Sequence, residues 1–336
     1  MFPETHFTDP ASVEAWDCWF RWRERGVLRD QTVDATWSRV GNAIASVEGP
    51  SAGKWARRFI DAFRHFRLLP GSQLLRFAGT GTPLGQLPPT AVVNAAAFVS
   101  SPGTANAAFD RPGFADAVGL TVRLLDDVLL ASDDARPGEG LRIGLIGVAD
   151  AIHNLDLRYD SPGARQFAGQ VAGALSEGAL LGATELARER GAAECDRPLL
   201  ARNWQDRGAP PRLVDELLRS GMRRTRLTVI EAQPRLALLA NNASDALDPR
   251  LPERPAQTAS RGCKLLDVPV LAQLELRAAM QPWIDAPIDY PVLSATEPDA
   301  DELETLQQLA RDHGLRPVTL RRVRSEPLFD DDGQEH

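Results

Sequence analysis

The chain has 336 residues, of which 43% are hydrophobic and 25% are charged, enough for one large domain or two ordinary ones with a sizeable core. Its 38 basic and 46 acidic residues give a net charge of −8, which argues against nucleic acid or an anionic membrane as a partner. Three widely spaced cysteines without a CxxC pair disfavour a disulfide framework or a zinc site. No apolar run approaches the roughly 20 residues of a membrane span. The N-terminus lacks the features of a signal peptide, and we therefore expect a soluble cytoplasmic protein.

The N-terminal part of the chain predicts a layer of helices. Amphipathic spacing favours helices over residues 11–26, 32–47 and 52–66. Asp30 and Thr32 are the alternative N-caps of the second helix.

The middle of the chain alternates loops with apolar segments. A Gly- and Pro-rich loop covers residues 79–91, and the apolar run over 91–99 predicts a short buried strand. Helical spacing predicts a helix over 111–131 and a long, alanine-rich one over 161–190. Between them, residues 141–158 begin as a buried segment whose glycines indicate close packing against another backbone.

The C-terminal third is predicted to be mixed. Helices are expected over 211–218, 269–280 and 300–313, and short strands over 227–230 and 236–240. Residues 245–262 are rich in Pro and Asp and predict a loop, and the acidic end of the chain, 330–336, predicts a disordered tail.

Five segments, in order along the chain, resemble the large catalytic subunit of ribonucleotide reductase, and they are closest to its vitamin-B12-dependent class. The segments are WDCWFRWRERGVLRDQTVDATWSRV (16–40), FRLLPGSQLLRFAGTGT (66–82), AAFDRPGFADAVGLTVRLLDDVL (107–129), RIGLIGVADAIHNLDLRYDS (142–161) and LRAAMQPWIDAPIDYPV (276–292).

The resemblance implies a helix-rich α/β fold in which a helical N-terminal layer precedes a truncated remnant of the reductase barrel. The domains expected from it are a helical region over 1–78, a barrel-like region over 79–329 and the tail over 330–336. The family is much longer, and the missing part falls around residues 82–90.

The residues that carry the family's radical chemistry are not found at the matching positions. The family motif is close to NPCGEQPLPP, and the corresponding stretch here is GTPLGQLPP (81–89), with Pro83 or Leu84 where the radical-carrying cysteine belongs. The GACNLGSINL stretch corresponds to TAVVNAAAFV (90–99), in which Asn94 is retained between alanines. We therefore expect no catalytic residue, and adenosylcobalamin follows only from the resemblance.

Three residues remain as candidates for binding substrate. The family's phosphate loop, APTGTIS, corresponds to AQPRLA (232–237), where Pro234 removes a backbone donor and Arg235 offers a charge. The candidates are Asn94, Arg235 and Asn241, and no metal site is expected.

Two further groups have both an ordinary and a functional interpretation. His153 with Asp150 and Asp156 could form a metal or acid–base site, although an ordinary histidine is favoured. Cys18, beside tryptophans, is expected to be a buried structural thiol. Cys263 is the one conceivable substitute for the missing radical-carrying cysteine.

Four functional hypotheses follow. The first is a reductase-like protein that does not reduce ribonucleotides and binds a reductase chain or a nucleotide. The others are an enzyme of different chemistry in the remodelled barrel, a product of a decaying gene, and a true B12-dependent reductase, to which only the resemblance points. The oligomeric state is left open.

Overall fold

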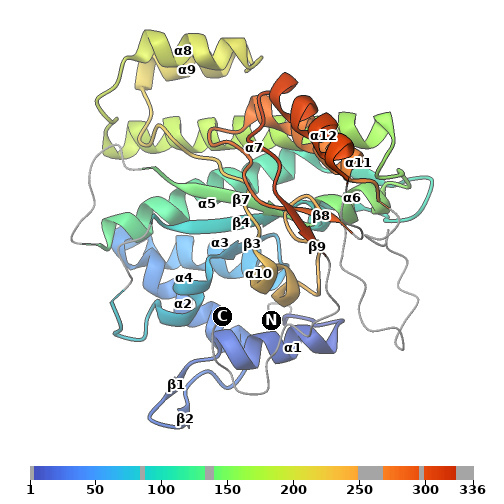
Figure 1. Cartoon of the computed structure of the whole chain (residues 1–336). Helices are drawn as coiled ribbons and strands as arrows, with labels where there is room; N and C mark the ends of the chain where they lie inside the picture. Colours follow the sequence, from blue (N-terminus) through green and yellow to red (C-terminus); the bar gives the residue numbers. More distant parts are fainter. Residues whose placement is uncertain (1–3, 84–87, 133–139, 249–267, 295–298, 323–336) are drawn as a thin grey trace.

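The centre of the fold is a three-stranded sheet of order β3-β4-β7, which lies between two groups of helices in the view of Figure 1. The computed structural model describes residues 4–83, 88–132, 140–248, 268–294 and 299–322. β3 (Leu68–Pro70) runs antiparallel to β4 (Thr90–Asn94), and β4 runs parallel to β7 (Arg142–Ile146). The predicted helix-rich α/β class is confirmed, and the described strands form no closed barrel.

One edge of the sheet is closed by a turn of the chain. Thr228 forms a parallel bridge with Ile143, so the β-like segment predicted over 227–230 exists as a single bridge. On the other side of Thr228, its N–H group donates to Asp285 Oδ2 at 3.1 Å, and its carbonyl accepts the N–H group of Ala286 at 3.2 Å. Since an unpaired strand edge is a template for a further strand, this turn ends the sheet here.

The N-terminal region is helical, as predicted, and it contributes β3 to the sheet. Its helices are α1 (Pro10–Ala15), the π-helix η1 (Trp16–Phe20), α2 (Val33–Ala45), the 3-10 helix η2 (Ser46–Ser51), α3 (Ala52–Arg64) and α4 (Ser72–Phe77). The predicted helices over 32–47 and 52–66 are confirmed. Thr32 is the N-cap of α2, because its side chain accepts the N–H group of Ala35 at 3.2 Å.

The helix predicted over 11–26 is wrong beyond Phe20. Residues 23–28 form a hairpin of β1 (Arg23–Glu24) and β2 (Val27–Leu28). Arg25 and Gly26 have φ values of 50° and 79°, which a helix cannot accommodate. Apolar residues continue past Phe20, so periodicity alone gave no sign of this turn.

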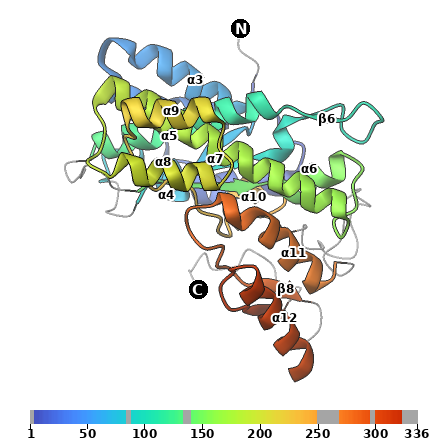
Figure 2. The same cartoon turned by 90° about the horizontal axis from the view of Figure 1, so that it is seen from above.

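Two long helices, α5 (Arg111–Leu130) and α7 (Pro162–Arg190), pack closely together beside the sheet and confirm two predicted helices (Figure 2). A Cβ at Gly178 would lie 2.5 Å from the carbonyl oxygen of Ala115, and one at Gly182 would lie 3.0 Å from the Cα of Gly119. The glycines of α7 therefore permit this close approach.

Shorter elements connect these parts. They are η3 (Ala95–Phe98), β5 (Val99–Ser100), β6 (Ala108–Phe109), α6 (Val148–Asn154), α8 (Arg197–Asp206), α9 (Pro211–Ser220) and α10 (Pro234–Leu239). The strand predicted over 91–99 ends at Asn94. The strand predicted over 236–240 is wrong, because this segment is helix α10, which begins at Pro234. Residues 236–239 are all buried, and a short apolar run does not distinguish a strand from a helix.

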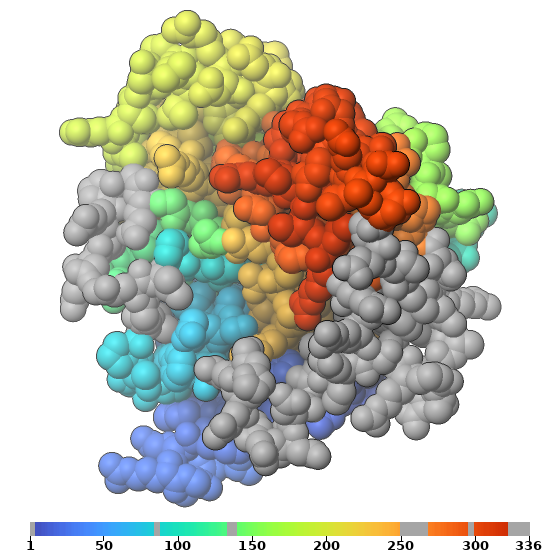
Figure 3. All heavy atoms as spheres, in the orientation of Figure 1, coloured from blue at the N-terminus to red at the C-terminus, as the bar shows by residue number. Residues whose placement is uncertain are grey.

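The C-terminal part forms a small unit beside the helical layer (Figures 2 and 3). It contains α11 (Val270–Met280), η5 (Gln281–Trp283), β8 (Val292–Ser294), α12 (Ala300–Asp312) and β9 (Leu320–Arg322). The parallel strands β8 and β9 are joined by α12. Gln273 closes the outer edge of β8, because its side-chain amide donates to the carbonyl of Leu293 at 2.8 Å and accepts its N–H group at 3.2 Å. The predicted helices over 269–280 and 300–313 are confirmed.

One hydrophobic core extends from Trp16 to Ile288 across residue 78, the position at which a domain boundary is predicted. A second, smaller core joins α11, α12 and the strands of the C-terminal unit. None of the described helices is long and apolar enough to cross a membrane. The predicted tail, 330–336, lies outside the described residues.

Candidate functional site at the carboxyl ends of the parallel strands

Asn94, the first predicted substrate-binding residue, is the last residue of β4 and is buried. Its Oδ1 atom accepts the N–H group of Ala96 at 3.1 Å and caps η3. It also lies against Gly147, whose φ of 73° begins α6. Ligands of open α/β sheets bind outside the carboxyl ends of the strands, which is where Asn94 lies. The position of Asn94 suits a ligand-binding site, but its side-chain oxygen already accepts the Ala96 N–H group.

Arg235 and Asn241 lie at the two ends of α10 and contact the N-terminal segment. The guanidinium carbon of Arg235 is 5.2 Å from the ring centroid of Trp19. Asn241 accepts the N–H group of Thr8 at 2.8 Å and donates to the carbonyl of His6 at 3.1 Å. None of their described hydrogen bonds or ring contacts involves Asn94. Their role in binding substrate stays a prediction.

The loop from residue 241 to 248, which we call the 241–248 loop, is the irregular segment beside these strand ends. Three of its non-glycine residues, Asn241, Asn242 and Ala246, have positive φ values of 56°, 54° and 45°. Such conformations cost of order 1–3 kcal/mol each and cluster at functional sites. The loop is tied to α6, because the Ser244 N–H group donates to Asp150 Oδ2 at 2.7 Å and the Asp150 N–H group donates to Ser244 Oγ at 3.2 Å.

Asp245 is a titratable group of this loop with a perturbed pKa. Its Oδ1 accepts the N–H group of Gln233 at 2.6 Å, directly before α10. Burial raises the pKa of Asp245 to about 7, and the nearby charge of Asp248 acts in the same direction. A carboxyl group that titrates near neutral pH can serve as a general acid or base, so Asp245 is a candidate that sequence reasoning missed.

Asp248 ends the described part of the loop and forms a buried ion pair with Arg277 of α11. Arg277 Nη2 lies 3.2 Å from both carboxylate oxygens, and Arg277 Nη1 donates to the carbonyl of Tyr290 at 3.0 Å. The Arg277 guanidinium carbon is 4.0 Å from the ring centroid of Tyr290. Burial raises the pKa of Asp248 above its usual range, and the charge of Arg277 opposes that effect. This pair fastens the C-terminal unit to the loop.

A cavity of about 330 Å³ adjoins the other side of the loop. Its lining consists of His153, Asp156, Leu157, Arg158, Tyr159, Asp160 and Val268. The Tyr159 hydroxyl donates to the carbonyl of Leu247 at 3.1 Å and so links the cavity to the loop. The structure brings His153 and Asp156 together here, but Asp150 bonds to Ser244 instead. The described residues contain no cluster of His, Cys, Asp and Glu that could hold a metal ion.

The cysteines differ from expectation in one respect. Cys18 is exposed on η1, so the prediction of a buried thiol is wrong: Trp16 and Phe20 of this π-helix turn inward while Cys18 faces solvent. Desolvation and the carboxylates of Glu14 and Asp17 raise the pKa of Cys18, which disfavours the reactive thiolate. Cys195 is half-buried just before α8, and Cys263 lies outside the described residues.

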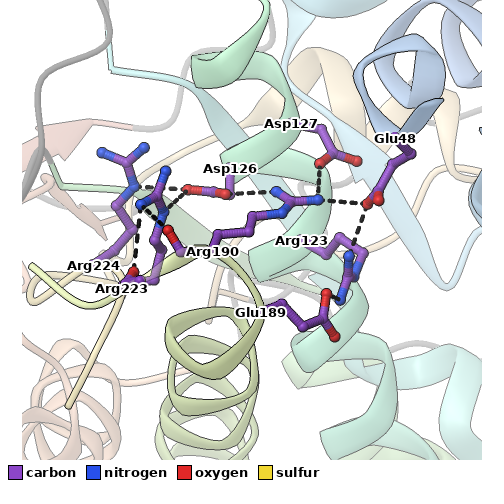
Figure 4. A network of polar contacts seen from close by, with 9 residues as sticks. Glu48, Arg123, Asp126, Asp127, Glu189, Arg190, Arg223 and Arg224 are labelled. Carbon is purple, nitrogen blue, oxygen red and sulfur yellow. Dashed lines mark hydrogen bonds and ion pairs between the residues drawn. The ribbon is translucent and has the colours of Figure 1, made fainter. Parts of the chain in front are cut away.

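A second buried polar cluster joins the helices away from the loop (Figure 4). Asp126 accepts hydrogen bonds from Arg190 at 2.6 Å and from Arg224 at 2.9 Å. Arg190 also donates to Asp127 at 2.8 Å and to Glu48 at 2.6 Å. Burial raises the pKa of Asp127 to about 7, and its Oδ2 atom has no hydrogen-bond partner. The cluster connects η2, α5 and α7, which is a structural role.

By its fold, this protein belongs to the class of helix-rich α/β proteins with an open sheet. The candidate site lies at the carboxyl end of a strand, at Asn94. Residues 90–209 match the family described as ribonucleotide reductase, barrel domain. The match begins with β4, includes β7 and ends just after α8, and it covers about a third of the chain. It supports a relation of this region to the large-subunit family of ribonucleotide reductases. No curated protein matches the chain.

The sequence predicted a loop from residue 245 and named Asn241, but it did not indicate the roles of Ser244, Asp245 and Asp248, because their partners come from distant segments. Ser244 and Asp150 are 94 positions apart, and Asp248 and Arg277 are 29 apart. The available local signal was the pair of asparagines at 241 and 242, since Asn adopts positive φ more readily than most residues.

Proposed function

We propose that this chain is a ribonucleotide reductase-like protein, closest to the B12-dependent class, that does not reduce ribonucleotides. It acts in the cytoplasm by binding a partner, and a catalytic reductase chain or a nucleotide is the natural ligand. The match of residues 90–209 to the barrel domain supports the relation to the family. The loss of activity rests on the residues at the site.

The observation that carries this proposal is the state of the segment that resembles the substrate phosphate loop. Residues 234–239 form α10, and the N-terminal segment packs directly on it. Ser12 Oγ donates to the carbonyl of Leu238 at 2.5 Å, and Trp19 faces Arg235. A phosphate cradle needs free N–H groups directed at the ligand. Here the N–H groups of Leu236 and Ala237 donate to the carbonyl of Gln233, the N–H group of Gln233 donates to Asp245, and Pro234 has none.

The described residues do not fit adenosylcobalamin. The cofactor's chemistry in this family requires a thiol that carries the radical, and Pro83, at one of the two matching positions, is an exposed proline. The cavity beside His153 and Tyr159, of about 330 Å³, lies at the lower end of the range for drug-sized ligands, and cobalamin is much larger than this cavity. We therefore derive no reaction step through this cofactor.

Two measurements on the purified chain test the proposal. The first incubates it with ribonucleoside di- and triphosphates, adenosylcobalamin and a dithiol, and we expect no deoxyribonucleotide. Formation of product would overturn the proposal, and a Cys263→Ser variant would then show whether that cysteine is the radical carrier.

The second measurement is thermal melting against ribonucleotides, deoxynucleotides and adenosylcobalamin. A ligand at 100 times its dissociation constant stabilises the folded state by about 2.7 kcal/mol. A shift with one nucleotide selects the nucleotide version of the proposal. With no shift, co-sedimentation with a purified catalytic reductase chain tests the partner version. A chain that does not melt cooperatively favours the decaying gene product.

A further inference from the structure

Helix α3 presents three adjacent cations on one exposed face. Lys54, Arg57 and Arg58 are all exposed, and α3 runs along the outside of the molecule in Figure 2. Their spacing of i, i+3 and i+4 places them side by side on the helix surface, with neighbouring Cβ atoms about 5–6 Å apart. We call these three residues the α3 basic face.

No carboxylate of the described residues forms an ion pair with this face, although other arginines of the region are paired. Arg64, at the end of the same helix, lies 2.6 Å from Asp34. Asp61, one turn after the basic face, lies 3.6 Å from His65 instead. Like charges at i and i+4 destabilise a helix, so Lys54 and Arg58 oppose each other. Asp61, at i+4 from Arg57 and i+3 from Arg58, is the acidic neighbour of the face on this helix, and it forms no described ion pair with either arginine.

Trp55 holds two of these cations in place. The Lys54 ammonium and the Arg58 guanidinium carbon lie 5.0 and 4.8 Å from the centroid of its ring. Arg123 stacks on the same ring at 3.9 Å, and it donates to Glu48 at 2.8 Å in the buried cluster of Figure 4. The indole is thus anchored to the interior, and cations held on it lose less freedom when they bind an anion.

The surroundings of the basic face select among anionic partners. Small molecules prefer concave sites, and the cavity of about 330 Å³ is lined by His153 of α6, the α6–α7 connection and Val268, and includes none of the three cations. The apolar face of α3, which includes Phe59 and Phe63, is buried in the core and cannot insert into a membrane. The net charge of −8 repels every polyanion, and it opposes a nucleic acid more than a short acidic segment because a nucleic acid carries a charge at every nucleotide.

We propose that Lys54 and Arg58, which contact Trp55, form together with Arg57 a docking surface for an acidic segment of a protein partner. This inference rests on the proposed binding function and names the chemistry of the partner. A helical segment with glutamates at i, i+3 and i+4 presents carboxylates at the same spacing as the three cations.

The test measures fluorescence anisotropy of a labelled helical peptide with glutamates at i, i+3 and i+4 over three turns, titrated with the full chain. The variant is K54E/R57E/R58E. The matched control, R202E/R212E/R316E, changes the net charge by the same amount. Its three arginines are exposed, lie on α8, on α9 and after α12, and have no described ion pair. We expect the first variant to bind roughly tenfold more weakly, or about 1.4 kcal/mol, and the control to bind like the wild type.

Binding must also weaken as salt increases, because the contacts are exposed ion pairs. Equal loss in the two variants, or no peptide binding at low salt, overturns the proposal. A single-stranded oligonucleotide and phosphatidylserine vesicles are titrated in parallel. Tighter binding of either one that depends on the basic face also overturns it. Since this readout requires no nucleotide and no turnover, its failure is distinguishable from failure of the proposed function.

Discussion

The buried pair of Asp248 and Arg277 allows a quantitative prediction. The two side chains are 6% and 4% exposed, and the closest nitrogen–oxygen distance is 3.2 Å. Arg277→Met keeps most of the side-chain volume but leaves the carboxylate buried without its cation. At an effective dielectric constant of about 20, Coulomb's law gives about 5 kcal/mol for charges at that distance. Removal of one partner of a buried pair typically costs about 3–5 kcal/mol. For 336 residues, that corresponds to a melting temperature lower by roughly 4–7 °C.

Urea denaturation at pH 8 measures the loss, and the double variant Asp248→Asn/Arg277→Met is the control. Because the double variant has no charge left at this site, we expect it to recover most of the loss. Burial already raises the pKa of Asp248, and without Arg277 the folded state takes up a proton more readily. The cost of Arg277→Met must therefore be smaller at pH 4 than at pH 8. A cost below about 1 kcal/mol at pH 8, or a double variant as unstable as the single one, would refute the reasoning.

Three further predictions concern the pH profile, the helix packing and the sheet edge. Because the pKa of Asp245 rises from 3.8 to about 7 on folding, the folded state binds the extra proton. The stability that this proton contributes is complete below pH 3.8 and is lost as the pH rises to about 7. In Asp245→Asn, the free energy of unfolding in urea should therefore depend less on pH between these values. An unchanged pH dependence contradicts the raised pKa of Asp245. Gly178→Ala should destabilise the fold by about 1–3 kcal/mol, because its new Cβ clashes with α5. Gly169→Ala, on the same helix, is the control and should not destabilise it, because its Cβ would meet only an ordinary 3.5 Å contact. Equal melting temperatures of the two variants would count against the close approach of α5 and α7. Asp285→Ala leaves the main-chain N–H groups of residues 227 and 228 without their acceptor. Hydrogen exchange at these two residues should therefore become faster than in the wild type. Unchanged protection would show that Asp285 does not close this edge of the sheet.

Local chemistry made much of the helical structure predictable. The long helices α5 and α7 begin at side-chain caps, Asp110 and Ser161, and their apolar residues follow the helical period. The small residues of α7, such as Gly178 and Gly182, are also visible in the sequence, and they permit the close approach of α5. The same reasoning failed where an apolar run was short, as in α10, or where a turn interrupted a continuing pattern, as after Phe20.

The sequence by itself determined the helix-rich α/β class and the absence of a cysteine from the segments that resemble the family's chemical motifs. The tertiary structure decided which distant segments meet: the β3-β4-β7 register, the closure of the sheet edge by Asp285, and the ion pair of Asp248 with Arg277. It also decided the environment of Asp245, whose pKa depends on burial by residues from several elements. Caps and periodicity act over a few residues, whereas burial and charge pairing depend on the folded arrangement of the whole chain.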